Sequence, residues 1–126
     1  MKKKVAGLAL AVSLLATAGF VQAGTTYIGY DVIVPKGNGD NTTGAQTKTT
    51  SSASADLKVT ILGKANDARA YTPNTGTGSW VRIASLTSGT KLPNSIKAGD
   101  KSVRAQFSSD FTTLVDSRVK GEWRSN

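Results

Sequence analysis

Residues 113–123 read Thr-Leu-Val-Asp-Ser-Arg-Val-Lys-Gly-Glu-Trp, and this stretch decides the fold class. Its odd-numbered positions from Val115 to Trp123 hold apolar or small residues, whereas its even-numbered positions from Asp116 to Glu122 are all charged. An alternation of period two places the two sets on opposite faces of a β-strand. The stretch therefore predicts a long strand with one buried face and one solvated face.

The same period of two occurs in three earlier segments. Their expected inward-facing residues are Ile28, Tyr30, Val32 and Val34 in the first, Leu57, Val59 and Ile61 in the second, and Val103, Ala105 and Phe107 in the third. Residues 80–86 are aromatic or β-branched with apolar groups on both faces, which is typical of a buried central strand. Residues 64–79 and 89–100 are rich in Gly, Pro and Asn, and we expect turns and loops there.

The domain that these segments build is predicted to be all-β. No window of 11 or more residues after residue 23 places apolar side chains at the helical spacing of three and four. Threonine, serine and glycine are abundant, and they favour strands and turns over helix interiors. We expect a small antiparallel β-sandwich or barrel of about five to seven strands joined as hairpins, with most aromatic side chains in the core.

A polar segment, residues 36–56, separates the first two predicted strands. It consists largely of Gly, Asn, Thr, Ser and Ala, with almost nothing to bury. Its Gly37-Asn38-Gly39-Asp40 run is strong turn chemistry, because Gly and Asn tolerate positive φ angles. We expect a flexible polar loop at about 36–56, and a polar strand at 46–54 or an arm that orders on binding are alternatives.

Residues 1–23 have the organisation of a secretory signal peptide. Three lysines at positions 2–4 precede an apolar run at 5–20, which ends in Val21-Gln22-Ala23. The run is shorter than the roughly 20 apolar residues that a membrane-spanning helix needs. The sequence therefore predicts a cleaved signal at 1–23, a single secreted β-domain at 24–126, and no transmembrane segment after cleavage.

The chain contains no cysteine and no histidine. Disulfides, thiol catalysis, thiolate metal sites and lipid attachment through cysteine are thereby excluded. The commonest general base and the usual partner of a nucleophilic serine are missing as well. Asp116 and Glu122 share a strand face but lie about 20 Å apart, too far for a glycosidase pair. We predict no enzymatic activity, no cofactor and no metal.

Basic residues are the candidate binding groups. Residues 24–126 hold 13 Lys and Arg against 8 Asp and Glu, a net charge of +5. Those at outward positions of the predicted strands, or just past the last one, are Lys58, Arg104, Arg118, Lys120 and Arg124. A shared positive face would bind an anionic cell-surface polymer or an envelope protein. The alternative is a solvated face that keeps strand edges from pairing with other molecules.

The order of segments also carries a resemblance. A signal, the run Tyr27-Ile28-Gly29-Tyr30-Asp31-Val32-Ile33-Val34-Pro35, a long polar loop, a strand at Trp80 and a final Val119-Lys120-Gly121-Glu122-Trp123 resemble small secreted β-proteins of Gram-positive bacteria. A more distant analogy is with bacteriocins of the lactococcin 972 type, from which this chain departs in length and in lacking histidine. The resemblance carries over no site residues.

Two functions are therefore expected. The first is a non-enzymatic exported protein that is retained non-covalently at the cell envelope through the cationic β-face. The second is a secreted antibacterial, bacteriocin-like protein. Dedicated nucleic-acid binding is not expected, because the aromatic side chains that would stack on bases are expected in the core.

Overall fold

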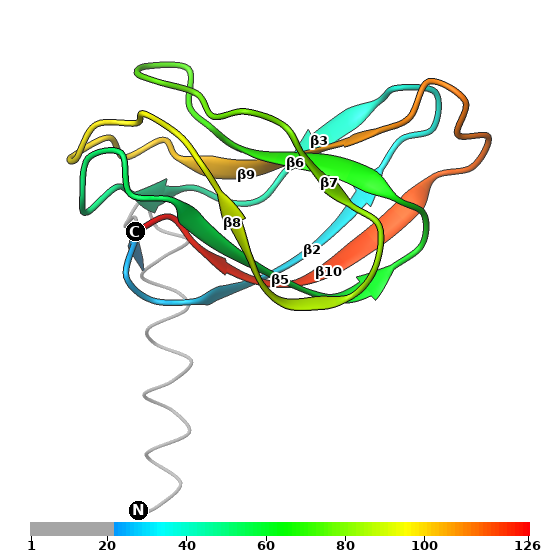
Figure 1. The fold of residues 1–126 in the computed structure, drawn as a ribbon, viewed down its shortest axis with the longest axis horizontal. Helices are drawn as coiled ribbons and strands as arrows, with labels where there is room; N and C mark the ends of the chain where they lie inside the picture. Colours follow the sequence, from blue (N-terminus) through cyan, green and yellow to red (C-terminus); the bar gives the residue numbers. More distant parts are fainter. Residues whose placement is uncertain (1–21) are drawn as a thin grey trace, which may run out of the picture.

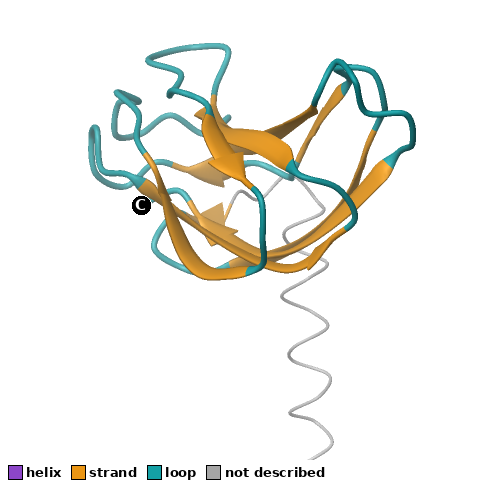
Figure 2. Cartoon of the chain, turned by 45° about the vertical axis from the view of Figure 1, so that its right-hand side comes forward, coloured by secondary structure: helices purple, strands orange, loops and turns teal. Residues whose placement is uncertain are grey.

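The computed structural model describes residues 22–126, so the predicted signal peptide at 1–23 lies almost wholly outside the described residues. Every regular element in the described range is a β-strand (Figures 1 and 2). The strands are β1 (Gln22–Ala23), β2 (Ile28–Val34), β3 (Asp40–Thr42), β4 (Gln46–Thr47), β5 (Ala55–Leu62), β6 (Asn66–Tyr71), β7 (Val81–Ile83), β8 (Thr87–Leu92), β9 (Arg104–Ser109) and β10 (Ser117–Arg124).

Two four-stranded antiparallel sheets pack face to face. The first has the order β2-β10-β5-β8 and the second the order β3-β9-β6-β7. The short strands β1 and β4 form a separate parallel pair. The predicted all-β class is confirmed, and the two packed layers make the domain a β-sandwich (Figure 2).

The connections differ from the predicted hairpins. Among the described strands, only β6 and β7 are consecutive strands that pair with each other. Every other connection between described strands of the two large sheets leads from one sheet to the other. The connecting segments at 72–80, 93–103 and 110–116 are long, so none has the two-residue turn of a tight hairpin. Apart from β6 and β7, the neighbouring strands of each large sheet are therefore distant in sequence.

The core lies between the sheets and follows the predicted alternation closely. In β10, Val119 and Trp123 are buried while Arg118, Lys120 and Glu122 face solvent. The remaining buried apolar side chains come from both layers and from the connection between β8 and β9, which supplies Ile96 and Val103. Those from the strands are Tyr30, Val34, Ala55, Leu57, Val59, Ala68, Ala70, Ile83, Leu92, Ala105 and Phe107.

One tyrosine joins three strands of the first sheet to the second sheet. Tyr30 of β2 lies opposite Gly121 of β10, and its hydroxyl donates to the carbonyl of Lys58 on β5 across a distance of 2.7 Å. Its ring packs on Phe107 of the second sheet, with the ring centroids 5.3 Å apart. A Cβ atom on Gly121 would lie 2.0 Å from the Lys58 carbonyl oxygen, so only glycine leaves room for this contact. Burial raises the pKa of Tyr30.

A β-bulge corrects one expectation in β5. Ile61 was expected to face inward with Leu57 and Val59, but it is exposed, and Leu62 packs against the core instead. The pairing of β5 with β10 shifts register between Lys120 and Gly121, which inserts one extra residue into β5. Because the side-chain period of a strand is two, that extra residue exchanges the faces of the residues beyond it.

Three other expectations about strands were wrong. Residues 80–86 do not form a central strand: β7 has three residues at the edge of its sheet. β6 and most of β8 occupy segments that were expected to be turns and loops. The inward positions of β6 are Asn66, Ala68 and Ala70, which are polar or small, so the segment lacks the apolar pattern of a buried strand.

The polar segment 36–56 contains β3, β4 and the start of β5. Its predicted turn is present, with positive φ angles at Gly37 and Asn38. Gln46 and Lys48 are fully buried and hold the end of β10: Gln46 donates to the carbonyl of Trp123 (3.0 Å) and accepts from the Ser125 amide (2.8 Å). Buried polar side chains thus hold this segment against the rest of the domain, as buried apolar side chains do in the other strands.

Lys48 has no acidic partner among the described residues. Its ammonium donates to the carbonyl of Ser125 (2.8 Å) and to that of Ala53. Burial lowers the pKa of Lys48 to about 8, because desolvation penalises the charged form. Through these two hydrogen bonds, Lys48 joins residues 48–53 to the residue that follows β10.

The close approach at Gly121 yields a stability prediction. Gly121→Ala should lower the free energy of unfolding by about 2 kcal/mol or more, because the new methyl group meets backbone that can move only with its strand. Chemical denaturation of the purified variant measures this change. Gly44→Ala is the matched control, since nothing lies within 4 Å of its Cβ position. Equal stability of the two variants would contradict the packing described here.

Candidate cationic binding face

Four of the five predicted binding residues lie on the outward side of the first sheet, and we call this surface the cationic face. It consists of Lys58 of β5, Arg118, Lys120 and Arg124 of β10, and Lys91 of β8, which was not predicted. β10 and β5 are the two inner strands of the sheet, so the four predicted residues lie across its middle, whereas Lys91 lies on the edge strand β8.

Tyr27, just before β2, lies between two of the cations. The Lys58 ammonium is 4.0 Å from the centroid of the Tyr27 ring, and the Arg124 guanidinium is 4.5 Å from it. Lys58 also pairs with Glu122 at 3.8 Å, a contact between two partly exposed side chains. Cations on an aromatic face are attracted by the ring's electrons, so Tyr27 lets two like charges approach each other.

Asp56 is the most strongly engaged acid of the cationic face. Its carboxylate pairs with Lys91 (2.5 Å) and with Arg124 (2.8 Å), and it accepts from the side-chain amide of Asn126 (3.0 Å). Burial alone would raise the pKa of Asp56, but the hydrogen bonds from Lys91, Asn126 and Arg124 outweigh it and lower the pKa to about 2. The group is therefore a carboxylate throughout the physiological range.

Arg118 and Lys120 surround the remaining acid of the face. Arg118 makes a two-point contact with Asp31, at 2.9 Å and 2.7 Å. This hydrogen bonding, with the added positive charge of Lys120, lowers the pKa of Asp31. Lys120 lies opposite Asp31 in the strand register and forms no ion pair with another described residue. Of the five cations of this face, it is therefore the one most available to an external anion.

Arg104 is not part of this surface. It lies on β9 in the second sheet, where its guanidinium donates to the carbonyl of Thr43 at 2.9 Å. The alternation in the sequence correctly predicted that Arg104 faces outward. A sandwich has two outward faces, however, one on each sheet. The structure therefore separates Arg104 from the other four predicted residues.

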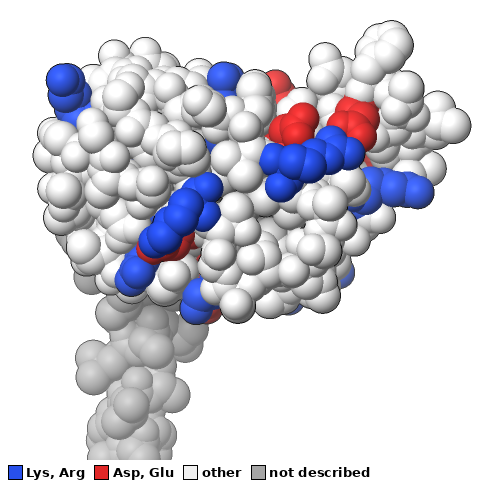
Figure 3. All heavy atoms as spheres, viewed as in Figure 1, with Lys and Arg blue, Asp and Glu red and all other residues white. Residues whose placement is uncertain are grey.

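The side of the molecule seen in Figure 3 shows no single continuous positive patch. In Figure 3, basic side chains adjoin acidic ones and are separated by uncharged surface. A shallow hollow beside Lys58 is lined by Val59 and Thr60 of β5 and by residues 86–88. Within residues 22–126, no three acidic side chains gather as a metal site would require, and no helix is long and apolar enough to cross a membrane.

The aromatic residues divide between core and surface, which corrects the expectation that most are buried. Tyr30, Phe107 and Trp123 are buried, whereas Trp80 and Phe111 are exposed. Trp80 lies beside the second sheet with the guanidinium of Arg69 4.3 Å from its ring centroid. Tyr71 contacts the same guanidinium at 5.6 Å.

Sequence reasoning missed two members of the site. Tyr27 occupies an odd position in the first predicted strand, so the same parity that points Asp31 outward could have placed it among the cations. Lys91 lies in a segment interpreted as loop, and it meets Asp56 only through the pairing of β5 with β8. No local pattern in the sequence reports that pairing.

Comparison of the chain with protein-family models, with curated proteins and with solved structures found no match. The resemblance to small secreted β-proteins of Gram-positive bacteria therefore stays a prediction.

The ion pairs of Asp56 predict an acid-sensitive contribution to stability. Because its pKa in the folded state, about 2, lies below the roughly 3.9 of an unfolded aspartate, the contribution is present above about pH 4 and lost as the pH falls towards 2. Between pH 5 and 2, wild type should lose about 2 kcal/mol more unfolding free energy than Asp56→Asn. Glu122→Gln is the control, because its more exposed pair with Lys58 should contribute little. If wild type and Asp56→Asn lost the same unfolding free energy between pH 5 and 2, this assignment would be refuted.

Proposed function

We propose that this protein is a non-enzymatic exported protein that binds anionic polymer of the bacterial cell surface through the cationic face. The observation that carries the proposal is the charge balance of that face. Its five basic side chains share the outward side of one sheet with three acids, Asp31, Asp56 and Glu122, each of which is in an ion pair. Two positive charges remain in excess.

The arrangement of the cations suits a polymer with repeated charges. Arg118 and Lys120 are two residues apart on one strand, a separation of about 7 Å, and Lys58 lies on the neighbouring strand. Arg118 is held in one orientation by Asp31, and Lys58 by Tyr27 and Glu122. Fixed side chains lose little conformational entropy when they bind, which favours even a modest electrostatic attraction.

Binding rather than catalysis is favoured by the state of the acids. Hydrogen bonds and ion pairs lower the pKa values of Asp31, Asp56, Asp100 and Asp110. A carboxylate with a lowered pKa is a weak general base at neutral pH. With no histidine or cysteine in the chain, these groups leave little for acid–base or nucleophilic chemistry.

The proposed location is outside the cell, with non-covalent retention at the envelope. The signal-like organisation of residues 1–23 supports export. Electrostatic attachment would also make retention reversible, because salt screens exposed charges over about 10 Å or less.

Binding to a defined polyanion tests the proposal. Residues 24–126 contain both large sheets and the whole core, so this fragment keeps the domain and removes the apolar run at 5–20. Its affinity for immobilised poly(glycerol phosphate) should fall about tenfold or more between about 50 and 200 mM salt. An uncharged dextran should not bind.

Matched variants locate the surface. The triple change Lys58→Gln, Arg118→Gln and Lys120→Gln should lower affinity for the polyanion about tenfold or more. Lys97→Gln, Lys101→Gln and Arg104→Gln remove the same charge outside the cationic face and should have a much smaller effect. Equal losses would show that net charge alone drives binding, and an affinity independent of salt would refute the mechanism. Killing of related bacteria by the same preparation would support the antibacterial alternative.

A further inference from the structure

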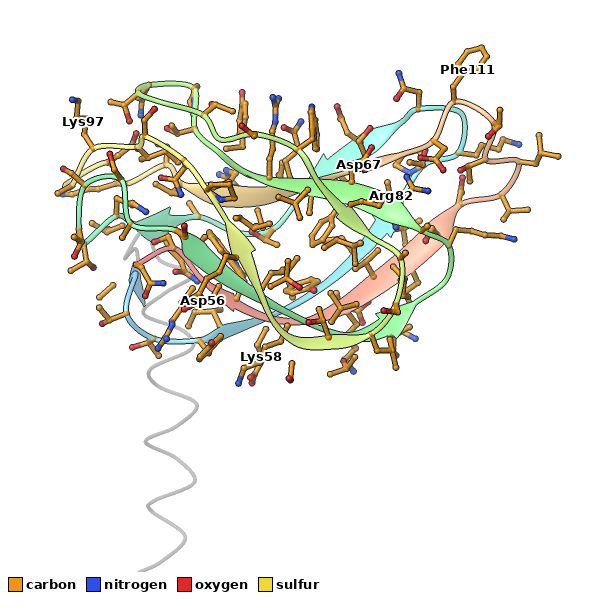
Figure 4. All side chains as sticks on the ribbon, viewed as in Figure 1. Asp56, Lys58, Asp67, Arg82, Lys97 and Phe111 are labelled. Carbon is orange, nitrogen blue, oxygen red and sulfur yellow. The ribbon has the colours of Figure 1, made fainter. Side chains whose placement is uncertain are left out.

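A second surface of the molecule has different chemistry. The loop between β9 and β10 exposes three apolar side chains, Phe111, Leu114 and Val115, and we call these the apolar tip. Phe111 is 84% exposed, Leu114 83% and Val115 50%. Figure 4 shows Phe111 projecting away from the body of the sandwich at one end of its long axis. Single exposed apolar residues are ordinary, but three within five residues of one loop are not.

The loop that carries the apolar tip is held in place by its neighbours. The amides of Gly37 and Asn38, in the turn before β3, donate to the carbonyls of Thr113 and Asp110, both at 3.0 Å. Asp110 also makes a two-point ion pair with Arg82 of β7, at 2.5 Å and 2.8 Å. The backbone of this loop is therefore held by hydrogen bonds, while its apolar side chains face solvent.

Lysines flank the apolar tip. The amide of Lys36 donates to the Asp116 carboxylate (3.1 Å), which places Lys36 at the base of the loop. The amide of Lys64 donates to the hydroxyl of Ser117 (2.8 Å), and Lys64 lines a shallow hollow with residues 112–115. Both lysines are exposed, and neither forms an ion pair with another described residue.

We propose that the apolar tip inserts into the surface of an anionic lipid bilayer while Lys36 and Lys64 contact the headgroup phosphates. Phenylalanine and leucine below a rim of lysine match the layers of a membrane interface, where acyl chains lie beneath negative headgroups. The inference relies on the proposed function only for export to the outer surface of the membrane. It is otherwise independent of the cationic face.

The shape of the apolar tip favours lipid over the other partners. A stable protein interface buries about 800 Å² on each side, whereas this tip is a narrow projection of one loop. A polymer of glycerol and phosphate offers little apolar surface against which a phenyl ring and a leucine side chain could be buried together. A bilayer has no fixed shape to match, so it accommodates a projection of this kind.

Vesicle binding tests the proposal with residues 24–126, because the apolar run at 5–20 would itself bind lipid. Sedimentation with vesicles of equal parts phosphatidylglycerol and phosphatidylcholine should show binding that is much weaker with phosphatidylcholine alone. Phe111→Ser with Leu114→Ser should lower the partition coefficient by about tenfold or more. Lys36→Gln and Lys64→Gln should each lower it about fivefold. Leu86→Ser, which removes another exposed leucine beside Lys58 and Thr60, should leave it unchanged.

A fluorescence measurement reports insertion directly. In the Phe111→Trp variant, brominated lipids should quench emission beyond the level seen in wild type, whose tryptophans in the domain are Trp80 and Trp123. The proposal would be overturned if the Phe111→Trp variant showed no extra quenching. It would also be overturned if vesicles were not bound at all, or if the Phe111 and Leu114 changes had no effect on binding. Thermal unfolding of the serine variants checks that the domain remains folded. If vesicles are not bound but poly(glycerol phosphate) is, the apolar tip fails while the cationic face stands. If vesicles are bound but poly(glycerol phosphate) is not, the cationic face fails while the apolar tip stands.

Discussion

The first sheet depends on the contact in which Tyr30 reaches across Gly121 to the carbonyl of Lys58. A glycine in the middle of a central strand leaves a gap on the core side, and the tyrosine of the neighbouring strand fills it. The Tyr30 hydroxyl donates a hydrogen bond to the Lys58 carbonyl, which lies near the points where the pairing of β5 with its neighbours changes register. Because the same ring packs on Phe107, the contact also sets how the second sheet lies on the first.

The surface chemistry follows from this arrangement. β10 keeps its alternation, so its charged residues face outward, where they meet cations and acids from β2, β5 and β8. The polar segment before β5 contributes through Gln46 and Lys48, which bind the chain just after Trp123. Long connections between the sheets leave loops at the ends of the sandwich, and one of these carries the apolar tip. The two candidate binding surfaces therefore occupy different parts of one sandwich.

The sequence predicted what depends on local periodicity. The faces of β2, β9 and β10 follow directly from alternation, and so does the outward position of Arg118 and Lys120. β6 escaped notice because its buried positions hold Asn66, Ala68 and Ala70, which are polar or small and give no alternation of large apolar side chains. Ile61 was assigned to the wrong face because a bulge is a property of two paired strands. The separation of Arg104 and the pairing of Lys91 with Asp56 likewise depend on strand order and register, which no single segment encodes.

The central claim is that anionic polymer contacts one particular face of the sandwich. Backbone amide chemical shifts, followed by NMR while poly(glycerol phosphate) is added to the isotopically labelled domain, test it most directly. We expect the largest shifts to lie on β5 and β10 around Lys58, Arg118 and Lys120, and to reverse when salt is added. Shifts centred on Arg104 and the second sheet, or spread evenly over all exposed lysines, would contradict it.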